Sequence, residues 1–76
     1  MSIIQPVIEK MEEVRVDLPK DWAETIAQRM GLRTEVVWAY AKGRRGKRDK
    51  MKALDILRHM KALRQEFIEE IEAETA

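Results

Sequence analysis

The hydrophobic and polar positions of this chain alternate mainly with the period of an α-helix. Apolar residues recur at steps of three and four in residues 2–14, 22–30 and 50–73, and this spacing places them on one face of each helix. A shorter apolar face continues up to residue 41. The pattern predicts an all-α domain of four to five helices, the last of them long. Because 76 residues suit one domain, we expect residues 1–76 to fold as a single unit.

The segment that ends the N-terminal region, residues 1–18, departs from the helical pattern. Apolar and polar residues alternate between Val14 and Leu18. Pro19 follows, and a residue before proline is pushed out of the α region. We therefore predict an extended segment. It is either a linker whose Val and Leu side chains pack on the core, or a short strand that pairs with a second chain.

Residues 21–43 have the features of two short helices joined by a tight turn. Ala27 is small, as required where two steeply crossing helices approach each other. Gly31 can adopt the positive φ of a sharp helix exit. Val37 is β-branched and can fill the angle between the helices. This combination predicts a helix-turn-helix unit.

The ends of these helices carry candidate caps. Asp21 and Glu24 have the spacing of a capping box at the start of the first helix of the unit. Asp49 is placed to cap the long last helix, and Gly43 stands where a C-terminal helix glycine belongs.

The central segment also resembles a known family. The residues that carry the resemblance are the run Ala27-Gln28-Arg29-Met30-Gly31-Leu32, followed by Val37, Tyr40 and Gly43. They resemble the helix-turn-helix of lambda-repressor-like and Cro-like DNA-binding proteins, which are small bacterial and phage regulators. The resemblance implies that the second helix lies in the major groove of double-stranded DNA. Family members often cap that helix with Ser or Thr at the place of Arg33, so either Thr34 caps a helix that starts one residue late or the cap is weak.

Carried onto this chain, the resemblance implies which side chains reach the bases. Arg33 can bond a guanine edge in two places, Thr34 can bond a base or phosphate, and Glu35 can accept from a cytosine amino group. Trp38 could contact a sugar or a thymine methyl, or could equally pack as core. The implied base contacts are Arg33, Thr34, Glu35, Trp38 and Ala39.

The distribution of charge adds to this interpretation. The net charge is only +1, but residues 42–52 hold seven basic and one acidic side chain. Residues 1–32 and 53–76 are both net acidic. A basic loop, residues 44–49, thus follows the second helix directly, as a phosphate-binding surface requires. The predicted phosphate contacts are Lys42, Arg44, Arg45, Lys47, Arg48 and Lys50.

Other chemistry finds little support in the sequence. The chain has no Cys, and its only histidine, His59, has no second metal-ligand candidate near it. Its paired glutamates are adjacent along helices and do not face each other, so no catalytic group can be assembled. We expect no enzyme activity, cofactor, metal or small-molecule substrate. Without an apolar run of membrane length or a signal peptide, a cytoplasmic protein is the simplest expectation.

The chain has more apolar surface than a small helical core needs. Left uncovered, it would form a patch unusual for a monomer, so we expect a homodimer. Alternatively, the two terminal stripes bury each other within one chain. The predicted interface is Phe67, Ile68 and Ile71 with Ile4 and Ile8. We therefore expect a sequence-specific transcriptional regulator or repressor. The alternatives are a helical protein-interaction or antitoxin-like module, and a non-specific architectural nucleic-acid-binding protein.

Overall fold

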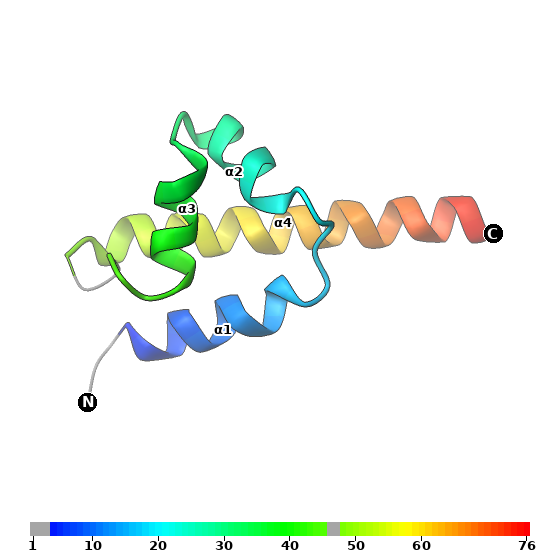
Figure 1. Ribbon diagram of the computed structural model, residues 1–76. Helices are drawn as coiled ribbons and strands as arrows, with labels where there is room; N and C mark the ends of the chain where they lie inside the picture. The colour runs from blue at the N-terminus through cyan, green and yellow to red at the C-terminus, as the bar shows by residue number, and fades with distance from the viewer. Residues whose placement is uncertain (1–3, 46–47) are drawn as a thin grey trace.

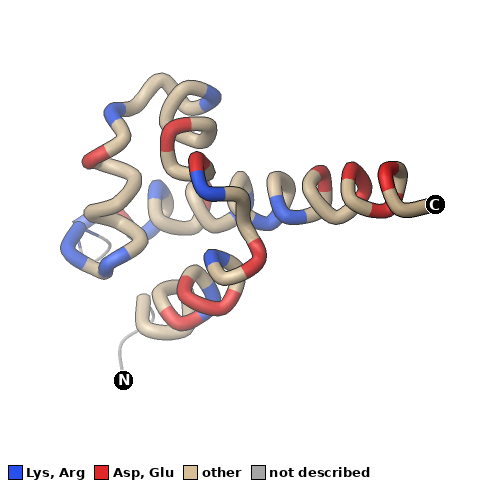
Figure 2. The backbone as a smooth tube through the Cα atoms, turned by 45° about the vertical axis from the view of Figure 1, so that its right-hand side comes forward, with Lys and Arg blue, Asp and Glu red and all other residues tan. Residues whose placement is uncertain are grey.

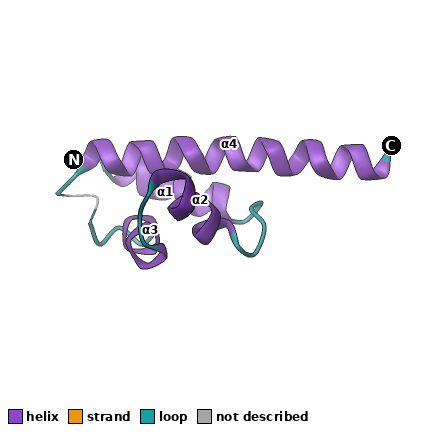
Figure 3. Cartoon of the chain, turned by 90° about the horizontal axis from the view of Figure 1, so that it is seen from above, coloured by secondary structure: helices purple, strands orange, loops and turns teal. Residues whose placement is uncertain are grey.

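The computed structural model describes residues 4–45 and 48–76, and the regular structure in these ranges is entirely helical. Figures 1 and 3 show the shorter helices packed on the long C-terminal helix, whose far end extends past all of them. The helices are α1 (Gln5–Arg15), α2 (Trp22–Met30), α3 (Thr34–Ala41) and α4 (Lys50–Thr75). The predicted all-α class, with a long last helix, is confirmed. Among the described residues, no helix has both the length and the apolar character that crossing a membrane requires.

The core lies where α1, α2 and α3 meet the first half of α4. Ile26, Val37 and Ile56 are completely buried, each on a different helix. Burial of an aliphatic side chain of this size contributes about 1.5–3 kcal/mol. Because α2 and α3 have only 9 and 8 residues, contacts of this kind hold them in place, since helices so short are marginal alone. The buried residues are Ile4, Met11, Val14, Trp22, Ala23, Ile26, Ala27, Val37, Tyr40, Ala41, Ala53, Ile56, Leu57, Met60 and Leu63.

The segment predicted to be extended is instead the end of α1 and a turn. Val14 and Arg15 are helical, and Val16 keeps helical angles of φ −58° and ψ −33°. The amide of Leu18 donates to the carbonyl of Arg15 at 3.2 Å, which satisfies one carbonyl of the last helical turn. Leu18 packs on the core as expected, but Val16 is 82% exposed.

The apolar stripe of α1 is covered inside the chain. Ile4 is 1% exposed, and Ile8 is half-buried with its side chain against the backbone of Gly43. Both residues were predicted to contact a second subunit, and they pack on their own core instead. The first residues of the predicted helix, including Ser2 and Ile3, lie outside the described part of the chain.

Helix α2 is tied to α4 by a two-pronged ion pair at the surface. Nη1 and Nη2 of Arg29 donate to the two carboxylate oxygens of Glu66 at 2.7 and 2.8 Å. The hydrogen bonds from Arg29 hold the pKa of Glu66 below its usual value, and the same bonds raise the pKa of Arg29. This pair fixes α2 against the part of α4 that follows the buried core.

Candidate nucleic-acid interface

The turn between α2 and α3 has the predicted geometry. Gly31 adopts φ 68° and ψ 34°, a left-handed conformation that glycine accepts without strain. The amide of Leu32 donates to the carbonyl of Ala27 at 2.8 Å, and the amide of Gly31 donates to that of Gln28. These bonds form a Schellman-type helix end. Ala27 and Val37 are both buried beside the turn, as a helix-turn-helix unit requires.

Helix α3 begins with a weak cap. Arg33 is the N-cap residue, with extended angles of φ −81° and ψ 147°, and its side chain makes no capping bond. Thr34 is the first helical residue, so it does not cap the helix. The amides of Thr34 and Glu35 make no hydrogen bond within the described residues, whereas those of Val36 and Val37 bond to Arg33. The start of α3 therefore presents free N–H donors at the positive end of a helix dipole.

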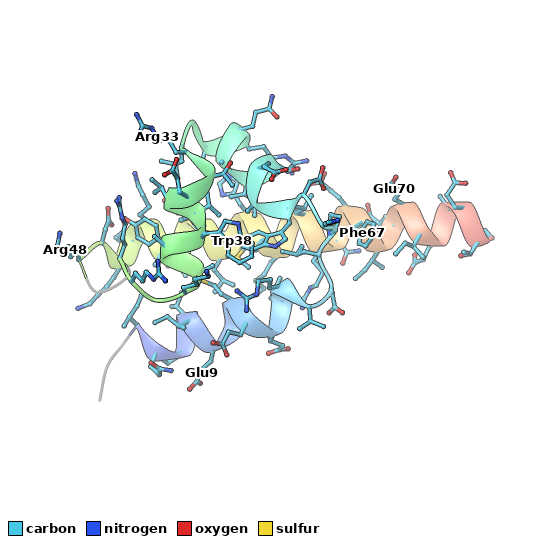
Figure 4. The ribbon with its side chains drawn as sticks, in the orientation of Figure 1. Glu9, Arg33, Trp38, Arg48, Phe67 and Glu70 are labelled. Atoms are coloured by element: carbon cyan, nitrogen blue, oxygen red, sulfur yellow. The ribbon has the colours of Figure 1, made fainter. Side chains whose placement is uncertain are left out.

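Three of the predicted base-contact residues lie together at this end of α3. Arg33 and Glu35 are exposed and Thr34 is half-buried. Figure 4 shows Arg33 pointing away from the helical core. Ala39 lies further along the helix, where it is half-buried and lines a hollow described below. Arg33, Thr34 and Glu35 thus form an edge at the start of α3, and Ala39 lies beside the hollow near its end.

Trp38 does not belong to that edge. Its ring packs edge-on against Trp22, with centroids 4.9 Å apart and planes at 62°. The guanidinium of Arg15 lies 5.5 Å from the ring centroid, and the ammonium of Lys42 lies 5.4 Å from it. Figure 4 shows the ring between α3 and its neighbouring helices. The prediction of a base contact is corrected here, because aromatic and cation–π contacts already use the ring.

A basic hollow follows the end of α3. Gly43, with φ 81°, and the 2.8 Å hydrogen bond from the amide of Arg44 to the carbonyl of Ala39 turn the chain away from the helix. The hollow has a volume of about 600 Å³, and the described residues that line it are Ala39, Tyr40, Arg44, Arg45 and Arg48. Figure 2 shows this cationic region at the loop before α4, while acidic residues gather on α1 and on the far end of α4.

The arginines of the hollow have no anionic partner among the described residues. The ion pairs among the described residues join Lys10 to Glu13, Arg29 to Glu66, and Arg58 to Asp55, and none of them involves an arginine of the hollow. Arg44, Arg45 and Arg48 are all exposed. Their charge is therefore available to an external anion.

The remaining predicted phosphate contacts lie in three different places. Lys42 lies over the Trp38 ring but is exposed. Lys50 is exposed and is the first residue of α4. Asp49 caps that helix by accepting from the amide of Lys52 at 2.9 Å. Lys47 falls outside the described residues.

Sequence reasoning missed one member of the hollow. Tyr40 is only 6% exposed, and it was read as part of the apolar face of α3. Its ring packs in the core while the residue also lines the hollow, and its hydroxyl makes no hydrogen bond within the described chain. Its residue type could have indicated this position, because tyrosine combines an apolar ring, which packs in a core, with a hydroxyl that forms hydrogen bonds.

The described residues do not form a metal centre. Nδ1 of His59 lies 2.8 Å from the carbonyl oxygen of Asp55, and no cluster of metal-binding side chains occurs in residues 4–45 and 48–76. The site is thus an exposed helix edge joined to a hollow of unpaired arginines. Such an arrangement can hold an anion beside hydrogen-bonding side chains.

Comparison of the chain with protein-family models, with curated proteins and with solved structures returns no match.

Proposed function

We propose that this chain is a small transcriptional regulator that binds double-stranded DNA sequence-specifically through α3 and the basic loop. One observation carries the proposal. Arg33, Thr34 and Glu35 follow the tight turn at Gly31, and the same helix leads into a hollow lined by three arginines that have no anionic partner among the described residues. Hydrogen-bonding groups and excess positive charge on one surface are what DNA recognition needs.

The proposal divides the surface into two parts. The start of α3 would enter the major groove, where Arg33 recognises guanine and Glu35 accepts from cytosine. Glu35 also repels phosphate, so it favours one pose over many. Arg44, Arg45 and Arg48 would bind the phosphate backbone, which sets affinity and orientation but not sequence preference. A homodimer would present two such surfaces to two half-sites.

The experiment starts with selection of a preferred duplex from a random library. The protein and its variants are then titrated against the selected duplex and against a scrambled duplex, at several salt concentrations. Arg33→Ala should weaken binding to the selected duplex by ~1–3 kcal/mol and leave scrambled DNA almost unaffected. Arg45→Ala should weaken both alike and lower the salt slope by about 1 unit.

Lys20→Ala serves as the control, because this exposed lysine lies in the α1–α2 turn, outside the proposed surface. Lys20→Ala should not lower the salt slope as Arg45→Ala does. It should also leave the preference for the selected duplex unchanged. If the selection yields no consensus and all variants lose affinity equally on both duplexes, the protein is an architectural binder instead. If no duplex binds, a protein-interaction module is the remaining class.

A further inference from the structure

The far part of α4 has no covering partner within the described chain. The last buried residue of the helix is Leu63, and every residue from Ile68 onward is exposed. Ile68 is 36% exposed and Ile71 is 47% exposed. Figures 1 and 3 both show this end of α4 extending beyond α1, α2 and α3. Two large aliphatic side chains therefore sit on a projecting helix that packs on nothing.

This projection has little to stabilise it as a helix of its own. A helical segment of two turns without tertiary contacts is marginal in water. Its acidic residues Glu72 and Glu74 lie near the negative end of the helix dipole, and the last turn holds no basic residue. A surface that supplies apolar contacts and positive charge would correct both deficits.

The exposed isoleucines belong to one stripe with charge at both ends. Arg64, Ile68, Ile71 and Thr75 follow one another at steps of 4, 3 and 4, the spacing of a two-stranded helical seam. Positive charge from Arg64 stands at one end of the stripe, and Glu72 stands beside the other end. When two copies of this stripe run in opposite directions, the arginine of each copy lies near the glutamate of the other.

We propose that residues 64–72 of α4 pair antiparallel with the same residues of a second copy of this chain, with the crossing at Ile68. In that arrangement, positions equally far from the crossing face each other, so Arg64 of each copy lies alongside Glu72 of the other. A parallel pair would place arginine beside arginine and glutamate beside glutamate. The charges of Arg64 and Glu72 therefore favour the antiparallel pair over the parallel one.

This inference rests on the dimeric regulator proposed above and gives that dimer its interface. Ile56, a fully buried core residue of α4, precedes Ile68 by 12 residues. At 1.5 Å per residue, the two Ile56 positions would lie about 36 Å apart along the paired helices. Half-sites one turn of DNA apart are separated by about 34–36 Å, so the pairing separates the two domains by a suitable distance.

The first test measures the molar mass of the full chain by sedimentation equilibrium, over micromolar to millimolar concentrations and without DNA. The parent should approach twice 9.0 kDa. Arg64→Glu and Glu72→Arg alone should each weaken dimerisation by about tenfold, because each turns two attractive pairs into repulsive ones. The double variant carrying both changes should recover the parent affinity. Circular dichroism of each variant verifies that the helices are intact.

A spin label at Thr75→Cys, in this cysteine-free chain, measures the direction of pairing. Position 75 lies 7 residues past Ile68, so an antiparallel pair places the two backbones about 20 Å apart along the helix axis. A parallel pair would leave them at the interaxial distance of about 8–10 Å. Unaffected dimerisation in both single charge variants, or the short distance, overturns the inference.

The two proposals fail separately. A parent that stays at 9.0 kDa yet binds a selected duplex overturns the antiparallel pair and leaves DNA recognition standing. A dimer that shows the charge-swap pattern but binds no duplex overturns DNA recognition and leaves the antiparallel pair standing.

Discussion

Two glycines set the path of the chain around α3, and they do so under different steric conditions. Gly31 and Gly43 both have positive φ, of 68° and 81°. A Cβ atom added at Gly31 would meet nothing within 4 Å, whereas one added at Gly43 would lie 3.0 Å from Cδ1 of Ile8. The first glycine is required by the backbone alone, and the second also by the packing of α1 on the end of α3.

Alanine substitutions separate these two requirements. Gly31→Ala should lower the free energy of unfolding by about 1–2 kcal/mol, the conformational cost of a left-handed residue. Gly43→Ala should cost more, because the contact with Ile8 adds to the same strain. Shortening that side chain by Ile8→Val should remove the excess from Gly43→Ala in a double-mutant cycle. Urea denaturation measures the parent and all four variants, and equal losses at the two glycines would contradict the packing contribution.

Single residues show where sequence reasoning succeeds and where it stops. Gly31 and Asp49 were predictable because a turn and a cap each demand particular residue types at particular offsets. Trp38 was not, because helical spacing locates a residue on the helix surface but does not say which neighbour the ring will meet. The contacts with Trp22 and Arg15 depend on how α1 and α2 are placed, which no local pattern encodes.

At the scale of elements, the period of apolar residues located the four helices of the described chain. Each helix contributes one apolar face to the shared core, and that face is visible in the sequence as a repeat of three and four residues. The ends were harder to predict. Five alternating residues from Val14 to Leu18 fit an extended segment as well as a helix end, and in the structure they form the end of α1 and a turn. Asp21 stands at the N-cap of α2, as predicted, but its side chain accepts no capping bond. Its main-chain carbonyl accepts instead from the amide and hydroxyl of Thr25.

The contact between α2 and α4 should make stability depend on pH in a defined direction. The pKa of Glu66 is lowered in the folded state by its hydrogen bonds to Arg29. Its contribution to stability is therefore present above the pKa of an unfolded glutamate and is lost as pH falls through the lowered folded value. Glu66→Gln should destabilise the protein at neutral pH and make no difference once acid has protonated the parent residue.

Glu69→Gln is the matched control for this prediction. It removes the same charge from an exposed position on the same helix, where the structure shows no ion pair among the described residues. Urea denaturation at neutral and acidic pH should show the pH-dependent difference for Glu66→Gln only. Added salt should also reduce that difference at neutral pH, because both side chains are exposed. A constant difference across pH would mean that the pair contributes through packing alone.

At the scale of the whole molecule, charge and shape divide the chain into two ends. Unpaired arginines and the start of α3 lie at one end, and the exposed, acidic end of α4 lies at the other. The sequence indicated both regions, because charge runs and excess apolar residues can be counted along a chain. It could not assign the apolar residues to a surface. Ile4 proved to be buried and Ile8 half-buried against the core, whereas Ile68 and Ile71 remained uncovered once the helices were packed.

That separation of the two ends predicts the behaviour of a shortened protein that ends at Phe67. The buried residues extend only to Leu63, and the Arg29–Glu66 pair is retained, so the helical core should still form and unfold cooperatively. The shortened protein should sediment as a monomer.

It should bind a duplex with one half-site as the parent does, because α3 and the basic loop are unchanged. On a duplex with two half-sites it should bind about 100-fold more weakly, since the gain from joining two binding modules is lost. Fluorescence anisotropy with the two duplexes measures both affinities. An unchanged affinity for the two-half-site duplex would mean that the projecting end of α4 does not join two DNA-binding domains.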